Sequence, residues 1–113
     1  MNDPLLEPFD LAGLRLRNRV FSSSHSPGYN VDGTPSDRYV RYHEEKALGG
    51  IGLTMIGGSS NVSIDSASLW GQLSFATDAV IDPLAVMVER IHGHGAAIMC
   101  QLTHMGRRNV SND

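Results

Sequence analysis

Polar residues and glycines with binding chemistry follow three apolar runs of the chain. These segments are Ser23-Ser24-His25, Gly57-Gly58-Ser59 and the stretch from Gln101 to Arg108. Hydroxyl, amide and imidazole groups can form directed hydrogen bonds, and paired glycines let a ligand approach the backbone closely. Because parallel α/β folds bind ligands at the carboxyl ends of their strands, these segments predict a binding site there.

The side chain at the end of the third run, Gln101, is an uncharged amide that can both donate and accept. Such a group matches the amide and imide edge of a flavin or a nucleobase. The alternative is a glutamine that caps the sheet and binds backbone. Likewise, Gly57-Gly58 suits either close approach of a planar ligand or a tight turn after a strand. The residues alone leave both pairs of alternatives open.

The loop after Gln101 carries His104, Arg107 and Arg108. A neutral histidine near guanidinium groups suits an anionic or electron-rich ligand, although surface loops often carry such residues. Among the five histidines, His92 and His94 flank a helix end, where the helix dipole favours them. No cysteine or carboxylate stands at ligand spacing with the histidines, so no metal site is predicted.

The composition limits the classes of protein to which the chain can belong. The chain has 113 residues, is 41% hydrophobic and carries a net charge of -3. This apolar content supports a buried core, and the negative charge argues against nucleic acid or an anionic membrane as partner. Neither a membrane-spanning run nor the basic start of a secretory signal is present, which predicts a cytoplasmic protein. The single cysteine, Cys100, stands in an apolar run, so we expect a buried and inert thiol.

Alternating and continuous apolar patterns predict the order hairpin, strand, helix, strand, helix, strand. The hairpin spans Phe9-Asp10-Leu11 and Leu14-Arg15-Leu16-Arg17, and the strands are residues 20–24, 51–56 and 96–102. Near-continuous apolar strands separated by amphipathic helices indicate parallel pairing with right-handed crossovers. Neither G-x-G-x-x-G nor G-x-x-x-x-G-K-[ST] is present, so a dinucleotide-binding fold is not supported.

The helices are predicted from caps and apolar stripes. For the first, Thr34 is the expected cap and Pro35 the first helical residue, and Gly49-Gly50 ends the helix. For the second, Asp82 and Pro83 take the same two positions. Between the second strand and this helix, residues 61–78 are predicted to form a long polar loop that contains Trp70, and loops of this length are usually functional.

Taken together, these segments resemble the N-terminal part of the Old Yellow Enzyme family of FMN-dependent oxidoreductases, from Leu6 to Arg108. The hairpin with Leu14-Arg15-Leu16-Arg17-Asn18-Arg19-Val20 is similar to the segment that closes the bottom of that family's (β/α)8 barrel. Gln101-Leu102-Thr103-His104-Met105-Gly106-Arg107 is similar to its third-strand signature. The resemblance implies an α/β fold made of the first three strand-helix units of a TIM barrel, preceded by an N-terminal β-hairpin.

The resemblance also implies where FMN binds. By position, the cofactor contacts fall on Ser23, Ser24, His25, Ser26, Gly58 and Gln101. His104 and Arg107 are implied as further contacts to the substrate or the flavin loop. In trimethylamine dehydrogenase a cysteine holds the flavin covalently near the position of Ser26, so FMN is expected to be non-covalent here. Many members have proline and methionine near Ser24 and His25, which this chain lacks.

Within the family, the chain is most similar to the branch with trimethylamine dehydrogenase, dienoyl-CoA reductase and the dimethylglycine or N-methylproline demethylases. The implied activity is oxidation of an N-methylated amine by hydride transfer to flavin. The alternative is an NAD(P)H-dependent ene or 2,4-dienoyl-CoA reductase. A rival of another class is a non-enzymatic α/β module that binds a partner through its strand edges.

A complete barrel takes about 250 residues, so residues 1–113 are expected to be the incomplete N-terminal part of an FMN-binding domain, inactive in isolation. The catalytic residues and the flavin phosphate site are expected beyond Asp113. The resemblance allows an iron–sulfur cluster and FAD or NAD(P)H in regions outside this chain. The expected partner is a small-molecule substrate, and homo-oligomerisation of the parent protein is a further expectation.

Overall fold

The computed structural model describes residues 2–66 and 71–108. Its centre is a parallel sheet in the order β3-β6-β9, with β3 at Phe21–Ser22, β6 at Leu53–Ile56 and β9 at Ala97–Cys100. Phe21 pairs with Leu53, and Leu53 pairs with Ala97. The predicted parallel order is therefore confirmed, although each strand is shorter than the apolar run that predicted it.

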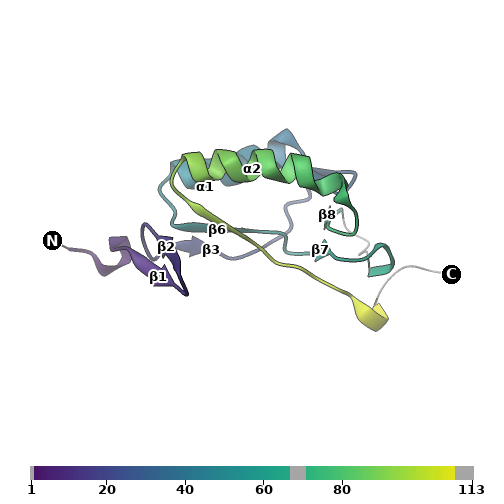
Figure 1. The fold of residues 1–113 in the computed structure, drawn as a ribbon, viewed down its shortest axis with the longest axis horizontal. Coiled ribbons are helices and arrows are strands. Elements are labelled where there is room, and N and C mark those ends of the chain that lie inside the picture. The colour runs from purple at the N-terminus through teal and green to yellow at the C-terminus, as the bar shows by residue number, and fades with distance from the viewer. Residues whose placement is uncertain (1, 67–70, 109–113) are drawn as a thin grey trace.

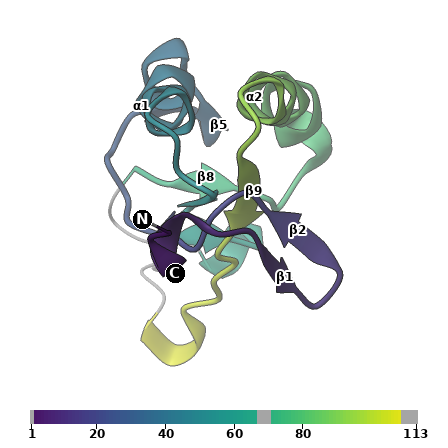
Figure 2. The same cartoon turned by 90° about the vertical axis from the view of Figure 1, so that its left-hand side faces the viewer.

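Two helices, α1 (Asp37–Leu48) and α2 (Ile81–Gly93), lie side by side along one face of this sheet (Figures 1 and 2). The apolar stripes of the two helices pack against every second residue of the strands, those whose side chains point toward the helices. The buried core between helices and sheet consists of Tyr39, Val40, Ala47, Ile56, Leu73, Met87, Ile91 and Ala96. The central sheet thus has three strands covered by two α-helices, and no α-helix follows β9 among the described residues.

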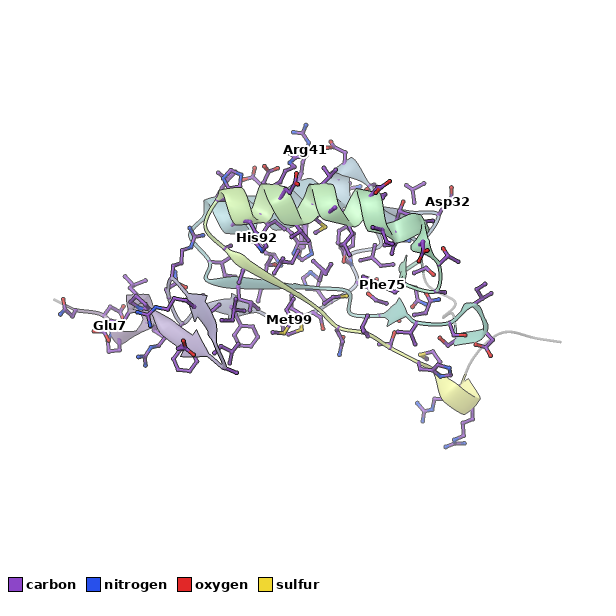
Figure 3. The ribbon with its side chains drawn as sticks, in the orientation of Figure 1. Glu7, Asp32, Arg41, Phe75, His92 and Met99 are labelled. Atoms are coloured by element: carbon purple, nitrogen blue, oxygen red, sulfur yellow. The ribbon has the colours of Figure 1, made fainter. Side chains whose placement is uncertain are left out.

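The opposite face of the sheet is also apolar. An apolar cavity of about 370 Å³ lies between the sheet and the hairpin of β1 (Phe9–Leu11) and β2 (Leu14–Leu16), lined by Leu53, Met55 and Met99 together with hairpin side chains. Met99 lies on the side away from the helices in Figure 3. Strands that are apolar on both faces are typical of parallel α/β barrels.

Arg17 joins the hairpin to the rest of the fold. Its guanidinium donates to the carbonyl oxygens of Ile51 at 3.0 Å, Ala47 at 2.6 Å and His94 at 2.6 Å. Ala47 lies in the last turn of α1, and His94 caps α2. A cation at two helix C-termini satisfies carbonyls that lack helical partners and opposes the helix dipoles. The hairpin is therefore fixed at the end of the fold where both helices finish.

Both helices begin differently from the prediction. Ser36, not Thr34, caps α1, since its hydroxyl accepts from the backbone N–H of Tyr39 at 3.2 Å. Thr34–Pro35 instead form β5, which pairs with β4 at Asn30–Val31. The local hairpin therefore takes the residues that were expected to start the helix.

The second helix starts at Ile81, directly after the 3-10 helix η3 at Asp78–Val80. Asp82 and Pro83 therefore lie in its first turn, and Asp82 is not the cap. The cap position is Val80, which has no side chain that could accept a hydrogen bond. The preceding 3-10 turn continues into the helix, so a capping residue is not needed to begin it.

The region predicted as a long polar loop has internal structure. It contains β7 (Ser60–Asn61), the 3-10 helix η2 (Ile64–Ser66) and β8 (Leu73–Ser74), and β7 pairs with β8 in parallel. Trp70 lies outside the described residues. Two further 3-10 helices are η1 (Pro4–Leu6) and η4 (Gly106–Arg108). In the described part of the chain, no helix has the length and apolarity needed to cross a membrane.

Candidate functional site

The carboxyl ends of β3 and β9 are joined by a hydrogen bond between two predicted site residues. The Ser24 hydroxyl donates to Oε1 of Gln101 at 2.6 Å. The Gln101 backbone N–H bonds the carbonyl of Ile56 at 3.0 Å and so continues the β6–β9 ladder. Its side chain therefore bonds another side chain rather than backbone, and it stays exposed. The side chain thus lacks the backbone contact that was expected of a sheet cap.

The two glycines after β6 bring three strand ends into contact. Gly58 has φ +79°, and a β carbon there would lie 2.4 Å from the backbone of both His25 and Ser26. At Gly57, with φ +103°, a β carbon would lie 2.8 Å from the carbonyl oxygen of Gln101. Only glycine tolerates both the left-handed backbone and this proximity. The pair is thus more than a turn, because it lets the site segments pack directly on one another.

Two side chains of the β3–β4 loop are held by other parts of the fold. Nε2 of His25 is hydrogen-bonded to the hydroxyl of Tyr42 on α1. The Ser26 hydroxyl donates to the carbonyl of Gly71 at 3.5 Å, while Ser23 stays exposed. Tyr42 was not among the predicted site residues. Its contact with His25 depends on tertiary structure and has no sequence signal.

A cavity of about 550 Å³ opens beside these segments. Ser26 and Gly58 line it together with Ser59, Thr103 and Met105. The Thr103 hydroxyl is shielded from solvent and has no hydrogen-bond partner among the described residues. Thr103 and Met105 were not predicted as site residues individually, although both stand in the segment from Gln101 to Arg107 that resembles the family's third-strand signature.

The polar wall behind Ser59 was not expected. The Ser59 hydroxyl donates to Oε1 of Gln72, and Nε2 of Gln72 donates to Oδ1 of Asn61 at 3.0 Å. Asn61 and Gln72 are buried, so these amides are fixed by each other. They come from β7 and the segment before β8, within the region predicted as loop.

His104 and Arg107 form no hydrogen bond with the other predicted site residues among the described contacts. Nδ1 of His104 accepts from the backbone N–H of Gly106 at 3.0 Å, so a neutral imidazole carries its proton on Nε2. Arg107 is exposed on η4, which lies at the opposite end of the molecule from the hairpin in Figure 1. Neither side chain lines the cavity. The Ser24–Gln101 hydrogen bond involves neither side chain.

Two titratable groups lie between the sheet and the helices, near the site but behind it. His43 is fully buried, and its Nδ1 is 2.7 Å from the Thr54 hydroxyl. Burial, followed by the nearby charge of Lys46, lowers the pKa of His43 to about 3. Cys100 is partly rather than fully buried, and desolvation raises its pKa. A raised pKa keeps the thiol protonated, which agrees with the expected inert role.

No three His, Cys, Asp or Glu side chains come together as a metal site within residues 2–66 and 71–108. Hydroxyl and amide groups of Ser24, Ser26 and Gln101 stand at the strand ends together with the backbone at Gly58. Such a set recognises a neutral polar ligand edge through hydrogen bonds.

Residues 4–113 match the model of the NADH:flavin oxidoreductase / NADH oxidase family. The chain belongs to this family. It is 55% identical over 95% of its length to "Multifunctional alkene reductase/demethylase OYE" of Caballeronia cordobensis. It is 45% identical, again over 95% of its length, to "Probable N-methylproline demethylase" of Rhizobium meliloti (strain 1021). The suspected family resemblance is therefore confirmed.

The fold agrees with this assignment. The solved old yellow enzyme from Trypanosoma cruzi superposes with a TM-score of 0.83 over 95% of this chain, at 26% identity. The chain is thus an α/β part of the TIM-barrel fold of that family. It spans 28% of that structure and 16% of each of the two curated relatives.

Proposed function

We propose that this chain is the N-terminal part of an FMN-binding barrel domain whose parent protein oxidises an N-methylated amine by hydride transfer to flavin. The observation that carries the proposal is the Ser24–Gln101 hydrogen bond at the carboxyl edge of the sheet. It presents a fixed amide at the place where parallel α/β folds bind ligands. The names of the two curated relatives supply the choice of N-methylated substrate.

The residues present fit the polar edge of FMN. With Oε1 of Gln101 engaged by Ser24, Nε2 remains as a donor for a carbonyl oxygen of the flavin pyrimidine ring. The close packing of Gly58 on His25 and Ser26 leaves backbone rather than side chains along the second strand end. By the resemblance, the position of a covalent flavin cysteine falls near Ser26, so the proposed FMN is non-covalent.

When bound, FMN would accept a hydride from the substrate carbon and so supply the oxidation. The residues of this chain would bind and orient it. The Gln101 amide would form a hydrogen bond with the pyrimidine edge of the flavin. The backbone of residues 23–26 and Gly58 would fix the plane of the flavin ring. Thr103 and Met105, which line the cavity, would lie beside it. The catalytic acid or base and the phosphate site are proposed to lie beyond Asp113.

The second candidate is an NAD(P)H-dependent ene or 2,4-dienoyl-CoA reductase. The printed name of the 55% identical relative combines alkene reductase with demethylase, which supports keeping both activities. The two share the proposed FMN site and differ in the substrate carbon presented to it. The family assignment disfavours a non-enzymatic interaction module.

The test uses the full-length protein loaded with FMN under anaerobic conditions. Addition of N-methylproline or N,N-dimethylglycine should bleach the flavin absorbance and release formaldehyde after turnover. An activated alkene with NADPH should react more slowly. Flavin that is bleached by NADPH and reoxidised by the alkene, with no response to either N-methylated amino acid, would replace the first candidate by the second.

Several features of the parent protein stay predictions from the resemblance and the composition. They are His104 and Arg107 as contacts to the substrate or the flavin loop, an iron–sulfur cluster, FAD or NAD(P)H in further domains, a homo-oligomeric state and a cytoplasmic location.

A further inference from the structure

A side-chain hydrogen bond to helix α1 holds the loop that follows β3 beside its first residues. Nε2 of His25 bonds the hydroxyl of Tyr42, which is 17 positions further along the chain. The two rings also meet edge to face, with their centroids 5.4 Å apart. α1 packs on the outer face of the sheet, so the His25 imidazole is directed toward the helix layer.

Tyr42 is itself held in place from several sides. Its ring packs edge to face against Tyr29 at 5.8 Å and against His43 at 5.1 Å. The ammonium of Lys46 lies 4.5 Å from the centre of the same ring. These contacts restrict the side chain, because the aromatic pairs and the cation each favour one ring orientation. The Tyr42 hydroxyl is therefore presented to His25 at a fixed point.

The hydrogen-bond roles of His25 follow from its two partners. Nδ1 lies 3.5 Å from the carbonyl oxygen of Ser23, which can only accept, so a neutral imidazole carries its proton on Nδ1. Nε2 then accepts from the Tyr42 hydroxyl. Loss of that hydroxyl would remove the only donor that the described residues offer to Nε2.

The backbone of His25 forms part of the candidate site. The carbonyl carbon of His25 and the nitrogen of Ser26 both lie 2.4 Å from the position of a β carbon at Gly58. A small movement of the loop would therefore change the wall beside the cavity.

We propose that Tyr42 is a positioning residue for the cofactor site: it holds the His25 imidazole against α1, so that the backbone of His25 and Ser26 faces the ligand. This inference rests on the proposed function. In this arrangement the His25 imidazole anchors the loop to α1, and the His25 backbone contacts the cofactor. It also gives a helix residue outside the cavity an influence on cofactor affinity.

The experiment is a double-mutant cycle in the full-length protein with Tyr42→Phe, His25→Leu and the double variant. The control is Tyr29→Phe, which keeps the ring that packs on Tyr42 and removes only a hydroxyl that accepts from Arg38 at 3.3 Å. Each variant is titrated with FMN, and the thermal unfolding of each apoprotein is measured.

Loss of one hydrogen bond predicts about fivefold weaker FMN binding for Tyr42→Phe. The double variant should bind no more weakly than His25→Leu, because the two residues act as one unit. The melting temperature of the Tyr42→Phe apoprotein should match that of Tyr29→Phe.

A spectroscopic arm separates positioning from general loss of structure. The ¹⁵N signals of the His25 imidazole should show the Nδ1–H tautomer in the wild-type protein and a tautomer mixture in Tyr42→Phe. Additive effects in the cycle, or unchanged FMN affinity in Tyr42→Phe, would overturn the proposal. If the wild-type protein binds no FMN, the proposed function fails, and the ¹⁵N spectra of the apoprotein still decide whether Tyr42 holds His25.

Discussion

The Ser24 hydroxyl and Oε1 of Gln101 lie 2.6 Å apart, although 77 positions separate the two residues in the chain. The bond connects the outer strands of the three-stranded sheet across the end of β6. The bond also determines which side-chain atom of Gln101 is left for a ligand, because Oε1 accepts from Ser24 and Nε2 does not take part. Two segments that are distant in the chain thus form one polar edge at this end of the sheet.

Replacement of Gly58 by alanine should destabilise the protein more than backbone strain alone predicts. The added β carbon would meet the backbone of His25 and Ser26 at 2.4 Å. Overpacking of this kind costs about 1–3 kcal/mol. The matched control is Gly13→Ala, because Gly13 has φ +91° and nothing within 4 Å of a β carbon. Both variants carry the strain of a left-handed backbone, and only the first carries the clash.

The measurement is urea unfolding of the full-length apoprotein for both glycine variants, with FMN titration of the same samples. The Gly58 variant should be less stable than the Gly13 variant and should bind FMN more weakly. Equal stabilities would show that residues 25–26 move aside freely, and would contradict the close packing described here.

The order of the main elements was predictable because long apolar runs and helical stripes are local signals. The starts of the helices were not. Thr34-Pro35 fits a helix start as well as a strand, and only pairing with Asn30–Val31 decides between them. The two-residue strands Ser60–Asn61 and Leu73–Ser74 are too short for any periodicity, so their region was predicted to be a loop.

The candidate site was predictable to a similar degree. Ser24, Gly58 and Gln101 stand at strand ends, which chain order reveals, and the structure brings them together. The contact of Tyr42 with His25 depends on how α1 is placed over the sheet, and the proximity of Gly58 to residues 25–26 depends on the path of a loop. Neither relationship leaves a pattern in the sequence.

Replacement of Arg17 by lysine should destabilise the fold despite conserving the charge. The guanidinium satisfies three carbonyl groups at once, those of Ala47, Ile51 and His94, and one ammonium cannot reach all three. Loss of partly buried, charge-assisted bonds predicts a decrease of about 3 kcal/mol in the free energy of unfolding. Arg41→Lys is the control, since Arg41 is 68% exposed and its ion pair with Asp37 contributes little. Chemical denaturation of both variants gives the comparison, and equal losses would refute the role assigned to Arg17.

Acid should destabilise the protein through His43. Its pKa is lowered to about 3 in the fold, against an ordinary value of 6.5. Between these values the unfolded chain binds more protons than the folded one, so stability is lost as pH falls below 6.5. From pH 7 to pH 5 the loss attributable to this residue is about 2 kcal/mol. His43→Gln, whose amide can still bond Thr54, should show a correspondingly smaller decrease over that interval. Parallel pH profiles for the two proteins would rule out a buried, neutral His43.

The most direct test of the central claim is FMN titration of the full-length protein carrying Gln101→Leu, with the flavin reduction potential measured on the same samples. Leucine keeps approximate volume and removes both hydrogen-bonding groups, which leaves the polar flavin edge against an apolar side chain at a cost of about 1–3 kcal/mol. FMN affinity should therefore fall about tenfold or more, and the potential should fall, because hydrogen bonds at that edge favour the reduced flavin. Ser24→Ala should weaken binding less, since it only frees the amide that Ser24 orients. Unchanged affinity and potential in Gln101→Leu would contradict the placement of the cofactor at this edge of the sheet.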